Sequence, residues 1–184
     1  MKKILLTSNG FENPRLGEEF SALVGKAPGQ MRCLFIPTAA VNPDALEVLP
    51  KCLYDLLDLG VASAQITVYD LHEPMDAQTL CGFDAVYVAG GDTRYLLRRM
   101  KEAGFGAVLE RFFESGGVYV GVSAGSIAAA ANHAHNLGYL PCALRVHCEK
   151  GSKPGTVDFG DCACIDLSPE QAVRIENDVF TIIQ

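Results

Sequence analysis

The sequence predicts an α/β protein with a mainly parallel sheet that helices cover on both faces. Short apolar runs alternate along most of the chain with segments whose apolar residues recur at helical spacing. This alternation indicates crossover connections between parallel strands. Two of the runs end in glycine-containing turns, which are typical of the sheet edge where open α/β proteins bind ligands. The tail consists of short runs separated by turns, which predicts a short antiparallel addition at one end of the sheet.

The strands of the parallel sheet are expected where compact, β-branched or aliphatic runs occur. These runs cover residues 3–8, 31–36, 66–71, 84–89 and 118–122. A short strand is expected at residues 143–147, between a loop at 132–141 and a charged turn at 148–155. Three further strands are expected in the tail, at residues 162–167, 172–175 and 179–183.

Helices are expected in the intervening segments. Apolar residues at helical spacing predict one helix over residues 16–24. Pro50 is expected to open a second helix, because proline is tolerated in the first turn, and Gly60 to end it. Further helices are expected from Arg94 onward, over residues 107–114, and from Ser123 to Ala131.

Length and charge restrict the classes of function. The 184 residues form a length typical of one domain, 1–184, and contain no repeat or long linker. A net charge of −7 without a dense basic run makes nucleic acid an improbable partner. The first residues lack the long apolar core of an export signal, so we expect a cytoplasmic protein with no membrane partner. A homodimer is compatible with the sequence.

The seven cysteines are an odd number and are scattered, which favours reduced thiols. Four of them, together with three histidines, could be imagined as a zinc cage: Cys142, Cys148, Cys162, Cys164, His133, His135 and His147. The paired C-x-x-C spacing of structural zinc sites is missing, so the sequence favours a protein without metal or cofactor.

The segment VYVGVSAGSIAAAA, residues 118–131, is the most informative stretch. Its order predicts a strand, a sharp turn and a helix. Gly121, Ser123 and Gly125 fill the G-x-S-x-G pattern, in which small neighbours let the backbone bend and leave the serine hydroxyl protruding. Ser123 is therefore the candidate nucleophile; the alternative is a serine that only caps the helix.

A second turn follows the strand at residues 84–89, where Gly90 and Gly91 precede Asp92 and Thr93. Taken alone, it is an ordinary turn into a helix capped by Asp92 or Thr93. Because parallel strands end at one sheet edge, we expect this turn to lie beside Ser123. The backbone amides of Gly91 and Ala124 could then both donate to one developing oxyanion.

A serine needs a base to take its proton, and the chain offers four histidines. His72 lies in a predicted surface turn, and His133 and His135 lie in a predicted loop beyond the helix. His147 ends a short apolar strand before a glycine-containing turn, which would bring its side chain to the sheet edge. His147 is therefore the favoured base, with His133 and His135 as the next choices.

The motifs VYVAGGDTRYLL and YVGVSAGSIAA together resemble those of the peptidase E family, serine peptidases related to aspartyl dipeptidase and more distantly to cyanophycinase. The opening TSNG and the tail DLSPEQAVRI add to the resemblance, which is poorest at residues 132–161. It implies a flavodoxin-like, class I glutamine amidotransferase-like fold. It also implies Ser123 as nucleophile, His147 as general base, and Gly91 and Ala124 as the oxyanion hole.

The chain departs from the family in two ways. The expected acidic residue after the nucleophile helix is replaced by Asn136, which leaves Glu149 or Asp158 as other candidates to orient the histidine. The arginine-containing stretch that recognises an N-terminal aspartate is also missing, so aspartate specificity is not expected. Substrate contacts are instead expected from Gly90, Asp92 and Lys150, with Lys153, Arg145 and Arg94 as other cations that could attract a carboxylate.

These patterns lead to three hypotheses. The first is a serine peptidase that cleaves small peptides through an acyl-serine intermediate, without a cofactor. The second is a non-catalytic binding module that keeps the two turns as a carboxylate or anion pocket. The third is a hydrolase of another acyl substrate, such as an ester, that uses the same serine.

Overall fold

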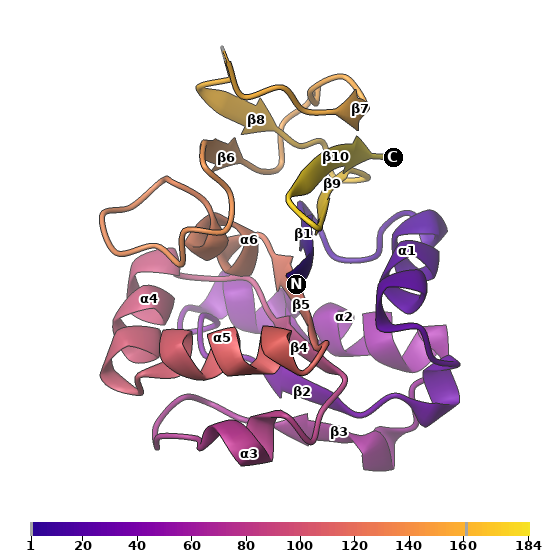
Figure 1. The fold of residues 1–184 in the computed structure, drawn as a ribbon, viewed down its shortest axis with the longest axis vertical. Helices are drawn as coiled ribbons and strands as arrows, with labels where there is room; N and C mark the ends of the chain where they lie inside the picture. The colour runs from indigo at the N-terminus through magenta and orange to yellow at the C-terminus, as the bar shows by residue number, and fades with distance from the viewer. Residues whose placement is uncertain (1, 161) are drawn as a thin grey trace.

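The computed structural model describes residues 2–160 and 162–184 and contains an eight-stranded sheet in the order β3-β2-β4-β5-β1-β9-β10-β7 (Figure 1). Its parallel part comprises β1 (Lys3–Thr7), β2 (Cys33–Ile36), β3 (Ile66–Val68), β4 (Ala85–Val88) and β5 (Val118–Val122). Every residue of β2, β4 and β5 is buried, as expected for parallel strands that are covered on both faces.

The helices divide between the two faces of this sheet. Residues of α1 (Pro14–Val24) and α2 (Pro43–Leu59) pack with one set of strand side chains. The other face is covered by α3 (Ala77–Leu80), α4 (Thr93–Glu102), α5 (Phe105–Glu114) and α6 (Ala124–Ala129). The two hydrophobic cores therefore lie on opposite sides of the sheet, with α1 and α2 apart from the other helices (Figure 1).

The tail extends the sheet with antiparallel strands. Strand β9 (Ala172–Glu176) pairs with β1, β10 (Val179–Ile183) pairs with β9, and the short β7 (Gly155–Thr156) pairs with β10. The predicted α/β fold, mainly parallel with a short antiparallel addition, is confirmed.

One tail strand lies elsewhere than expected. Strand β8 (Cys164–Asp166), within the run 162–167, pairs in parallel with β6 (Ala143–Arg145) and forms a separate two-stranded sheet. The Arg145 guanidinium donates to both carboxylate oxygens of Asp166, at 2.6 and 2.7 Å, so an ion pair spans the two strands. This pair of strands lies beyond α6, beside β9 and β10 at one end of the molecule (Figure 1).

Helix α2 begins earlier than the sequence predicted. Asn42 caps it by accepting a hydrogen bond from the Ala45 amide, and Pro43 occupies the first turn. Pro50, expected to open the helix, lies inside it. Asn42 and Pro43, a capping residue followed by a proline in the first turn, are the sequence features that mark where α2 begins. Helix α3, strand β7 and two short 3₁₀ turns, Pro28–Gln30 and Ser63–Gln65, were not predicted.

Among the described residues, none of the helices is both long and apolar enough to cross a membrane.

Candidate active site

Ser123 lies at the turn where β5 ends and α6 begins. Its backbone has φ 47° and ψ −103°, a conformation that residues with a side chain rarely adopt. The Ser123 amide donates to the carbonyl of Thr7 at the end of the neighbouring strand, at 3.1 Å. Strained backbone of this kind persists only where the surroundings enforce it, and it clusters at functional sites. The turn thus has the backbone geometry predicted from the G-x-S-x-G pattern.

Two glycines allow the backbone to approach itself closely at this turn. A Cβ atom on Gly121 would lie 2.6 Å from the backbone of Gly125, and one on Gly125 would lie 2.5 Å from the carbonyl oxygen of Val88. Real Cβ contacts are essentially never so short. Both positions therefore require glycine for steric reasons, independently of any chemistry at Ser123.

Buried hydroxyl groups hold the turn in place. Ser126 Oγ lies 2.7 Å from the carbonyl oxygens of both Thr7 and Gly121, and Thr7 Oγ1 donates to Gly121 O at 3.0 Å. From within the core, the Tyr119 hydroxyl donates to Gly125 O at 2.8 Å. These bonds satisfy the carbonyl groups of a tightly bent, buried segment. Nothing in the local sequence pattern indicates this role for the three side chains.

His147 follows β6 and reaches the serine. Its Nε2 atom lies 3.0 Å from Ser123 Oγ, within hydrogen-bonding distance. Its backbone has φ 57°, in the left-handed region. The structure therefore brings Ser123 and His147, which are 24 residues apart, into contact.

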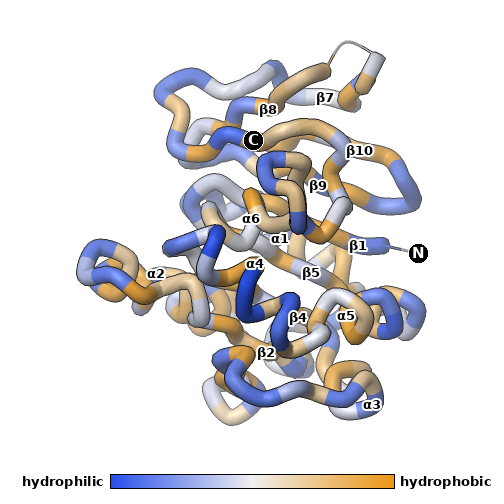
Figure 2. The backbone as a smooth tube through the Cα atoms, turned by 90° about the vertical axis from the view of Figure 1, so that its left-hand side faces the viewer, coloured by the Kyte–Doolittle hydropathy of each residue, from blue (hydrophilic) through white to orange (hydrophobic). Residues whose placement is uncertain are grey.

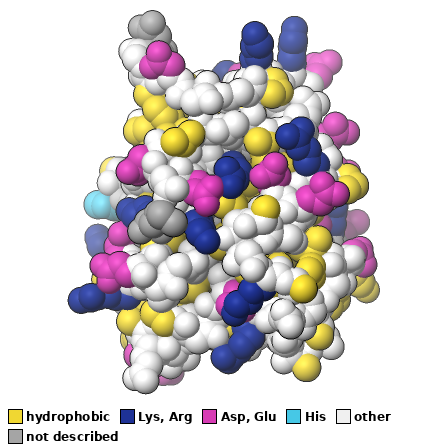
Figure 3. Space-filling view, turned by 45° about the vertical axis from the view of Figure 1, so that its right-hand side comes forward, with side chains coloured by type: hydrophobic (Ala, Val, Ile, Leu, Met, Phe, Trp, Pro, Cys, Tyr) yellow, Lys and Arg dark blue, Asp and Glu magenta, His cyan; other side chains and the backbone are white. Residues whose placement is uncertain are grey.

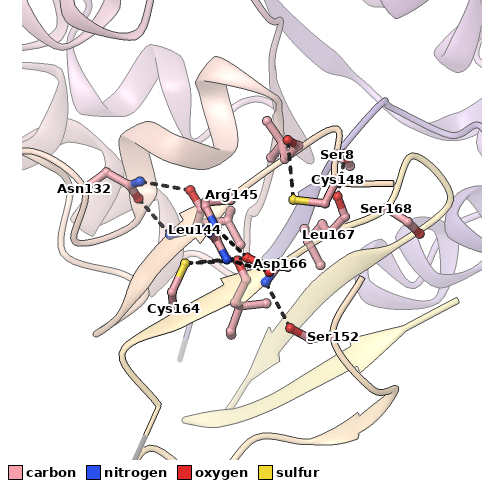
Figure 4. A network of polar contacts seen from close by, with 12 residues as sticks. Ser8, Asn132, Leu144, Arg145, Cys148, Ser152, Cys164, Asp166, Leu167 and Ser168 are labelled. Atoms are coloured by element: carbon pink, nitrogen blue, oxygen red, sulfur yellow. Dashed lines mark hydrogen bonds and ion pairs between the residues drawn. The ribbon is translucent and has the colours of Figure 1, made fainter. Parts of the chain in front are cut away.

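The segment that carries His147 is tied to the end of β1. The His147 amide donates to Ser8 Oγ at 2.8 Å, and the Ser8 hydroxyl lies 3.4 Å from the carbonyl oxygen of Leu167. The Cys148 amide also donates to the Leu167 carbonyl, at 3.0 Å. Figure 4 shows Ser8, Cys148 and Leu167 grouped beside the Arg145–Asp166 pair. Ser8 thus fixes the main chain at His147, a role that the sequence did not reveal.

Within residues 2–160 and 162–184, no charged side chain is paired with the imidazole of His147. Partial burial lowers the pKa of His147 below its ordinary value, and no neighbouring charge contributes to this shift. A carboxylate beside the ring would act in the opposite direction, by stabilising the imidazolium. The electrostatics thus describe a neutral imidazole in contact with a hydroxyl group.

The three residues proposed to orient His147 are engaged elsewhere or exposed. The Asn136 amide group donates to the His133 carbonyl and accepts from the Gly138 amide, within its own loop. Asp158 accepts from the Gly160 amide, and Glu149 is exposed. Over residues 2–160 and 162–184, none of the three is hydrogen-bonded to the His147 ring, and the structure gives the orienting hypothesis no support.

The glycine turn lies beside the serine, as the topology required. A Cβ atom on Gly90 would lie 3.3 Å from Ser123 Cβ. Gly91 has φ 138°, and a Cβ atom there would lie 2.0 Å from the Ala39 carbonyl oxygen, so no other residue fits. The Ala124 amide is one of the first donors of α6, which have no acceptor inside the helix. Gly91 and Ala124, the two residues expected to form the oxyanion hole, thus lie in the two neighbouring turns beside Ser123.

The other predicted substrate contacts differ in their surroundings. Gly90 lines the cavity at Ser123. The Asp92 carboxylate caps α4 by accepting from the Tyr95 amide at 2.8 Å, so it has a structural role that the sequence analysis had offered as the alternative. Lys150 and Lys153 are exposed, and Arg145 is paired with Asp166. Neither lysine lines the cavity at Ser123.

The cavity at Ser123 is small, about 90 Å³ in volume. Besides both glycines, Ser123 and His147, its lining consists of Asn9, Val48, Lys51, Cys52, Asp55 and Val122. Four of these lie on α2, at spacings of three or four residues that put them on one helix face. Of the four, only Val48 precedes Pro50, where the helix was expected to begin, and the local pattern does not indicate that this face lines a cavity.

A buried polar cluster closes the floor of this cavity. Asp55 accepts hydrogen bonds from the Tyr87 hydroxyl at 2.5 Å and from the Phe11 amide at 2.9 Å. Burial raises the pKa of the Asp55 carboxyl group, against the lowering effect of these two donors. Burial likewise raises the pKa of the Cys52 thiol, which keeps it protonated and a poor nucleophile.

The remaining histidines lie away from Ser123. His72 is exposed and bonded to Asp70, whereas His133 and His135 line a hollow beside α4.

Among the described residues, the cysteines do not form the zinc cage that the sequence could suggest, and Cys142 and Cys162 have sulfur atoms 3.8 Å apart. In the part of the chain that the structure describes, no three histidine, cysteine, aspartate or glutamate side chains are grouped so that they could hold a metal ion.

Comparison with known families matches residues 4–138 to the model of peptidase family S51. An uncharacterized peptidase of Listeria innocua is 31% identical over 136 residues, which cover 73% of this chain and 63% of the relative. One from Listeria monocytogenes is 32% identical over 139 residues, covering 73% and 64%. The chain thus matches less than two thirds of the length of either relative.

Two solved structures share the fold. A structure provisionally assigned as peptidase E from Listeria monocytogenes superposes with a TM-score of 0.76 at 18% identity, covering 100% of this chain and 98% of the other. A peptidase from an acI-B1 actinobacterium gives a TM-score of 0.69 at 17% identity, with coverage of 100% and 87%. At these identities the likeness establishes the architecture.

Proposed function

Because the chain belongs to peptidase family S51, as the resemblance of its two turns to peptidase E implied, we propose that it is a serine hydrolase that cleaves small peptides through an acyl-serine intermediate. The observation that carries this proposal is the 3.0 Å contact between Ser123 Oγ and His147 Nε2, at a turn that Gly90 and Gly91 adjoin. A nucleophile and a base within hydrogen-bonding distance are the first geometric requirement of this chemistry.

In the first step, Ser123 Oγ attacks the carbonyl carbon of the scissile peptide bond, and His147 Nε2 accepts the hydroxyl proton. The carbonyl oxygen gains a negative charge, towards which the amides of Gly91 and Ala124 donate hydrogen bonds. Such donors stabilise charge that develops only in the transition state, and each contributes about 3–4 kcal/mol in well-studied hydrolases.

In the second step, the C–N bond breaks and the protonated His147 gives its proton to the departing amine. The acyl group remains bonded to Ser123 Oγ. Water then attacks this ester while His147 accepts a proton from the water, and the collapse of the second tetrahedral intermediate releases the acid and restores Ser123. His147 ends each half of the cycle neutral, which its lowered pKa favours.

The small cavity favours small substrates. A volume of about 90 Å³ admits one short acyl side chain rather than an extended peptide. The Lys51 ammonium group lines this cavity and pairs with Glu12, so it offers a cation near the acyl position. Asp55 offers a carboxylate on the same helix face.

The proposal is tested by labelling with a fluorophosphonate probe and by assaying a panel of dipeptides. Wild-type protein is expected to react covalently, and Ser123→Ala to lose both labelling and turnover. His147→Ala should react about 10²–10⁴-fold more slowly, because a positioned base contributes on that scale. Ser115→Ala is a matched control, since Ser115 donates to the Phe112 carbonyl at the end of α5, outside the cavity. Absence of labelling in the folded wild-type protein would contradict the proposal.

The second candidate is a non-catalytic module that binds a carboxylate or another anion between the two turns. It is favoured by the lack of an acidic partner for the His147 ring among residues 2–160 and 162–184, because losing such a partner costs about 10⁴ in the turnover of serine peptidases. This candidate predicts that dipeptides raise the melting temperature of the protein without being cleaved, and that fluorophosphonate does not react.

A further inference from the structure

A basic groove lies beside α4, separate from the cavity at Ser123. It has a volume of about 390 Å³ and is lined by Arg94, Leu97, Arg98, Lys101, His133, Ala134 and His135. None of these residues lines the cavity at Ser123. The groove is therefore a distinct hollow, of a size in the range of about 300–1,000 Å³ that is typical of small-molecule sites.

The cations of the groove share one face of the helix. Arg94, Arg98 and Lys101 are spaced four and three residues apart, which places them side by side along α4. Figure 2 views the molecule with α4 towards the reader and shows its strongly hydrophilic course. Leu97 is only 7% exposed, so the groove has an apolar floor with basic groups along one wall.

The second wall is the segment that follows α6. His133 and His135 project from it, and the segment is anchored by main-chain hydrogen bonds from Leu137 to Ala128 and from Tyr139 to Ala129. Ala134 lies between the two histidines and adds to the apolar lining. The groove thus has nitrogen-bearing side chains on both walls.

These charges are uncompensated within the described part of the chain. The three α4 cations form no ion pair there with a carboxylate, whereas Arg99 on the same helix pairs with Glu102. Arg98 instead lies over the Tyr95 ring, at 4.9 Å, which leaves its charge intact. On the face seen in Figure 3, basic and acidic side chains are intermingled. The groove differs in having one sign of charge, in a chain whose net charge is −7.

Helix stability accounts for only part of this arrangement, because Lys101 lies in the last turn of α4, where a cation is favourable, but Arg94 and Arg98 do not. Like charges three or four residues apart each destabilise a helix by about 0.2–0.5 kcal/mol. Arg94 also lies in the first turn of α4, at the positive end of the helix dipole, where a cation is unfavourable. Cations at Arg94 and Arg98 that do not stabilise the helix, beside a hollow whose lining among the described residues contains no carboxylate, are explained by a ligand that supplies negative charge.

We infer that this groove binds a small molecule with two or more phosphoryl charges. A phosphoryl group carries up to three acceptor oxygens in a tetrahedral arrangement and more negative charge than a carboxylate, so it can accept more charge-assisted hydrogen bonds from the two walls. The guanidinium groups of Arg94 and Arg98 match phosphoryl oxygens in pairs. The apolar floor at Leu97 leaves room for an uncharged part of the ligand.

The experiment uses inorganic pyrophosphate as the probe and isothermal titration calorimetry at about 0.15 M salt, where the Debye length is about 8 Å. We expect saturable binding with a Kd below about 1 mM. The double variant Arg98→Gln/Lys101→Gln should bind at least about tenfold more weakly, because each charge-assisted hydrogen bond contributes on that scale. Because both side chains are on the surface, the melting temperature of the double variant should stay within about 4 °C of the wild type, which separates loss of binding from loss of folding.

The matched control is Arg111→Gln/Lys153→Gln, which removes two positive charges outside the groove. It should bind pyrophosphate as the wild type does, and Ser123→Ala should also, since the inference does not rest on the proposed function. Equal weakening in the control and groove variants would overturn the inference by showing an effect of net charge only. Tighter binding of citrate than of pyrophosphate, or no saturable binding of pyrophosphate, would overturn the assignment to a phosphoryl ligand.

Discussion

Substitution of Ser8 by alanine tests whether the main chain, rather than an acidic side chain, holds His147 in place. Ser8 is fully buried, and its hydroxyl oxygen accepts the His147 amide hydrogen at 2.8 Å. No atom of Ser8 lines the cavity at Ser123. In Ser8→Ala, the chemistry of the nucleophile and base is unchanged, but the main chain of His147 loses its tie to the end of β1.

The expected magnitude follows from the lost hydrogen bond. Leaving a buried or partly buried amide donor without an acceptor costs about 1–3 kcal/mol. Because the left-handed backbone of His147 already costs about 1–2 kcal/mol, the freed segment can relax to an ordinary conformation. A loss of about 1–2 kcal/mol in favour of misaligned conformers lowers the aligned population about 5- to 30-fold.

The assay is the second-order rate of fluorophosphonate labelling, measured with the melting temperature of each variant. We expect Ser8→Ala to label about 5- to 30-fold more slowly, by the same population argument. Ser115→Ala is the control because it also deletes a hydrogen bond from a hydroxyl to a carbonyl, outside the cavity. It should lose stability without a change in labelling rate. Equal labelling rates for Ser8→Ala and wild type would refute the role assigned to Ser8.

Three further predictions concern the turns and the base. Gly91→Ala should lower the free energy of unfolding by about 3 kcal/mol or more and abolish labelling, because its Cβ would lie 2.0 Å from Ala39 O; urea unfolding measures this, and wild-type stability would contradict it. Tyr119→Phe should cost about 0.5–1.5 kcal/mol and slow labelling, since it removes the side-chain hydrogen bond to the Gly125 carbonyl, and an unchanged rate would show that this bond does not position Ser123. Since partial burial lowers the pKa of His147 below 6.5, the acidic limb of kcat/KM should have its midpoint below 6.5. On acidification the unfolded chain takes up this proton at a higher pH than the folded protein does. The contribution of His147 to stability is therefore present above pH 6.5 and is lost as the pH falls through the folded-state pKa. An acidic limb of kcat/KM with its midpoint at or above pH 6.5 would contradict His147 as the base.

The sequence predicted the features that depend on local pattern. The alternation of apolar runs with helical segments gave the order of the parallel strands and helices, because buried strands must be apolar along their whole length. The G-x-S-x-G pattern gave the Ser123 turn, since Gly121 and Gly125 are sterically required there. The contact of His147 with Ser123 was a hypothesis drawn from chain order, and the 3.0 Å distance agrees with it.

Features that depend on tertiary contacts were not predictable. Ser8, Tyr119 and Ser126 are ordinary residues of a strand or helix, and only the fold brings their hydroxyl groups to the carbonyls they contact. The pairing of β8 with β6 was missed because a short apolar run does not encode its partner. The basic groove was missed because its two walls are more than thirty residues apart in sequence.

In the part of the chain that the structure describes, His147 has no charged partner, which separates two roles that an acidic residue usually combines. Such a residue holds the imidazole in position and also stabilises the imidazolium that forms during proton transfer. Here the Ser8 hydroxyl and the Cys148–Leu167 hydrogen bond can supply the first role through the main chain. Among the described residues no neighbouring charge supplies the second, and partial burial lowers the pKa of His147 without a charge to oppose it. A base with a lower pKa is weaker but remains neutral in more acidic solution, so this arrangement favours availability of the base over its strength.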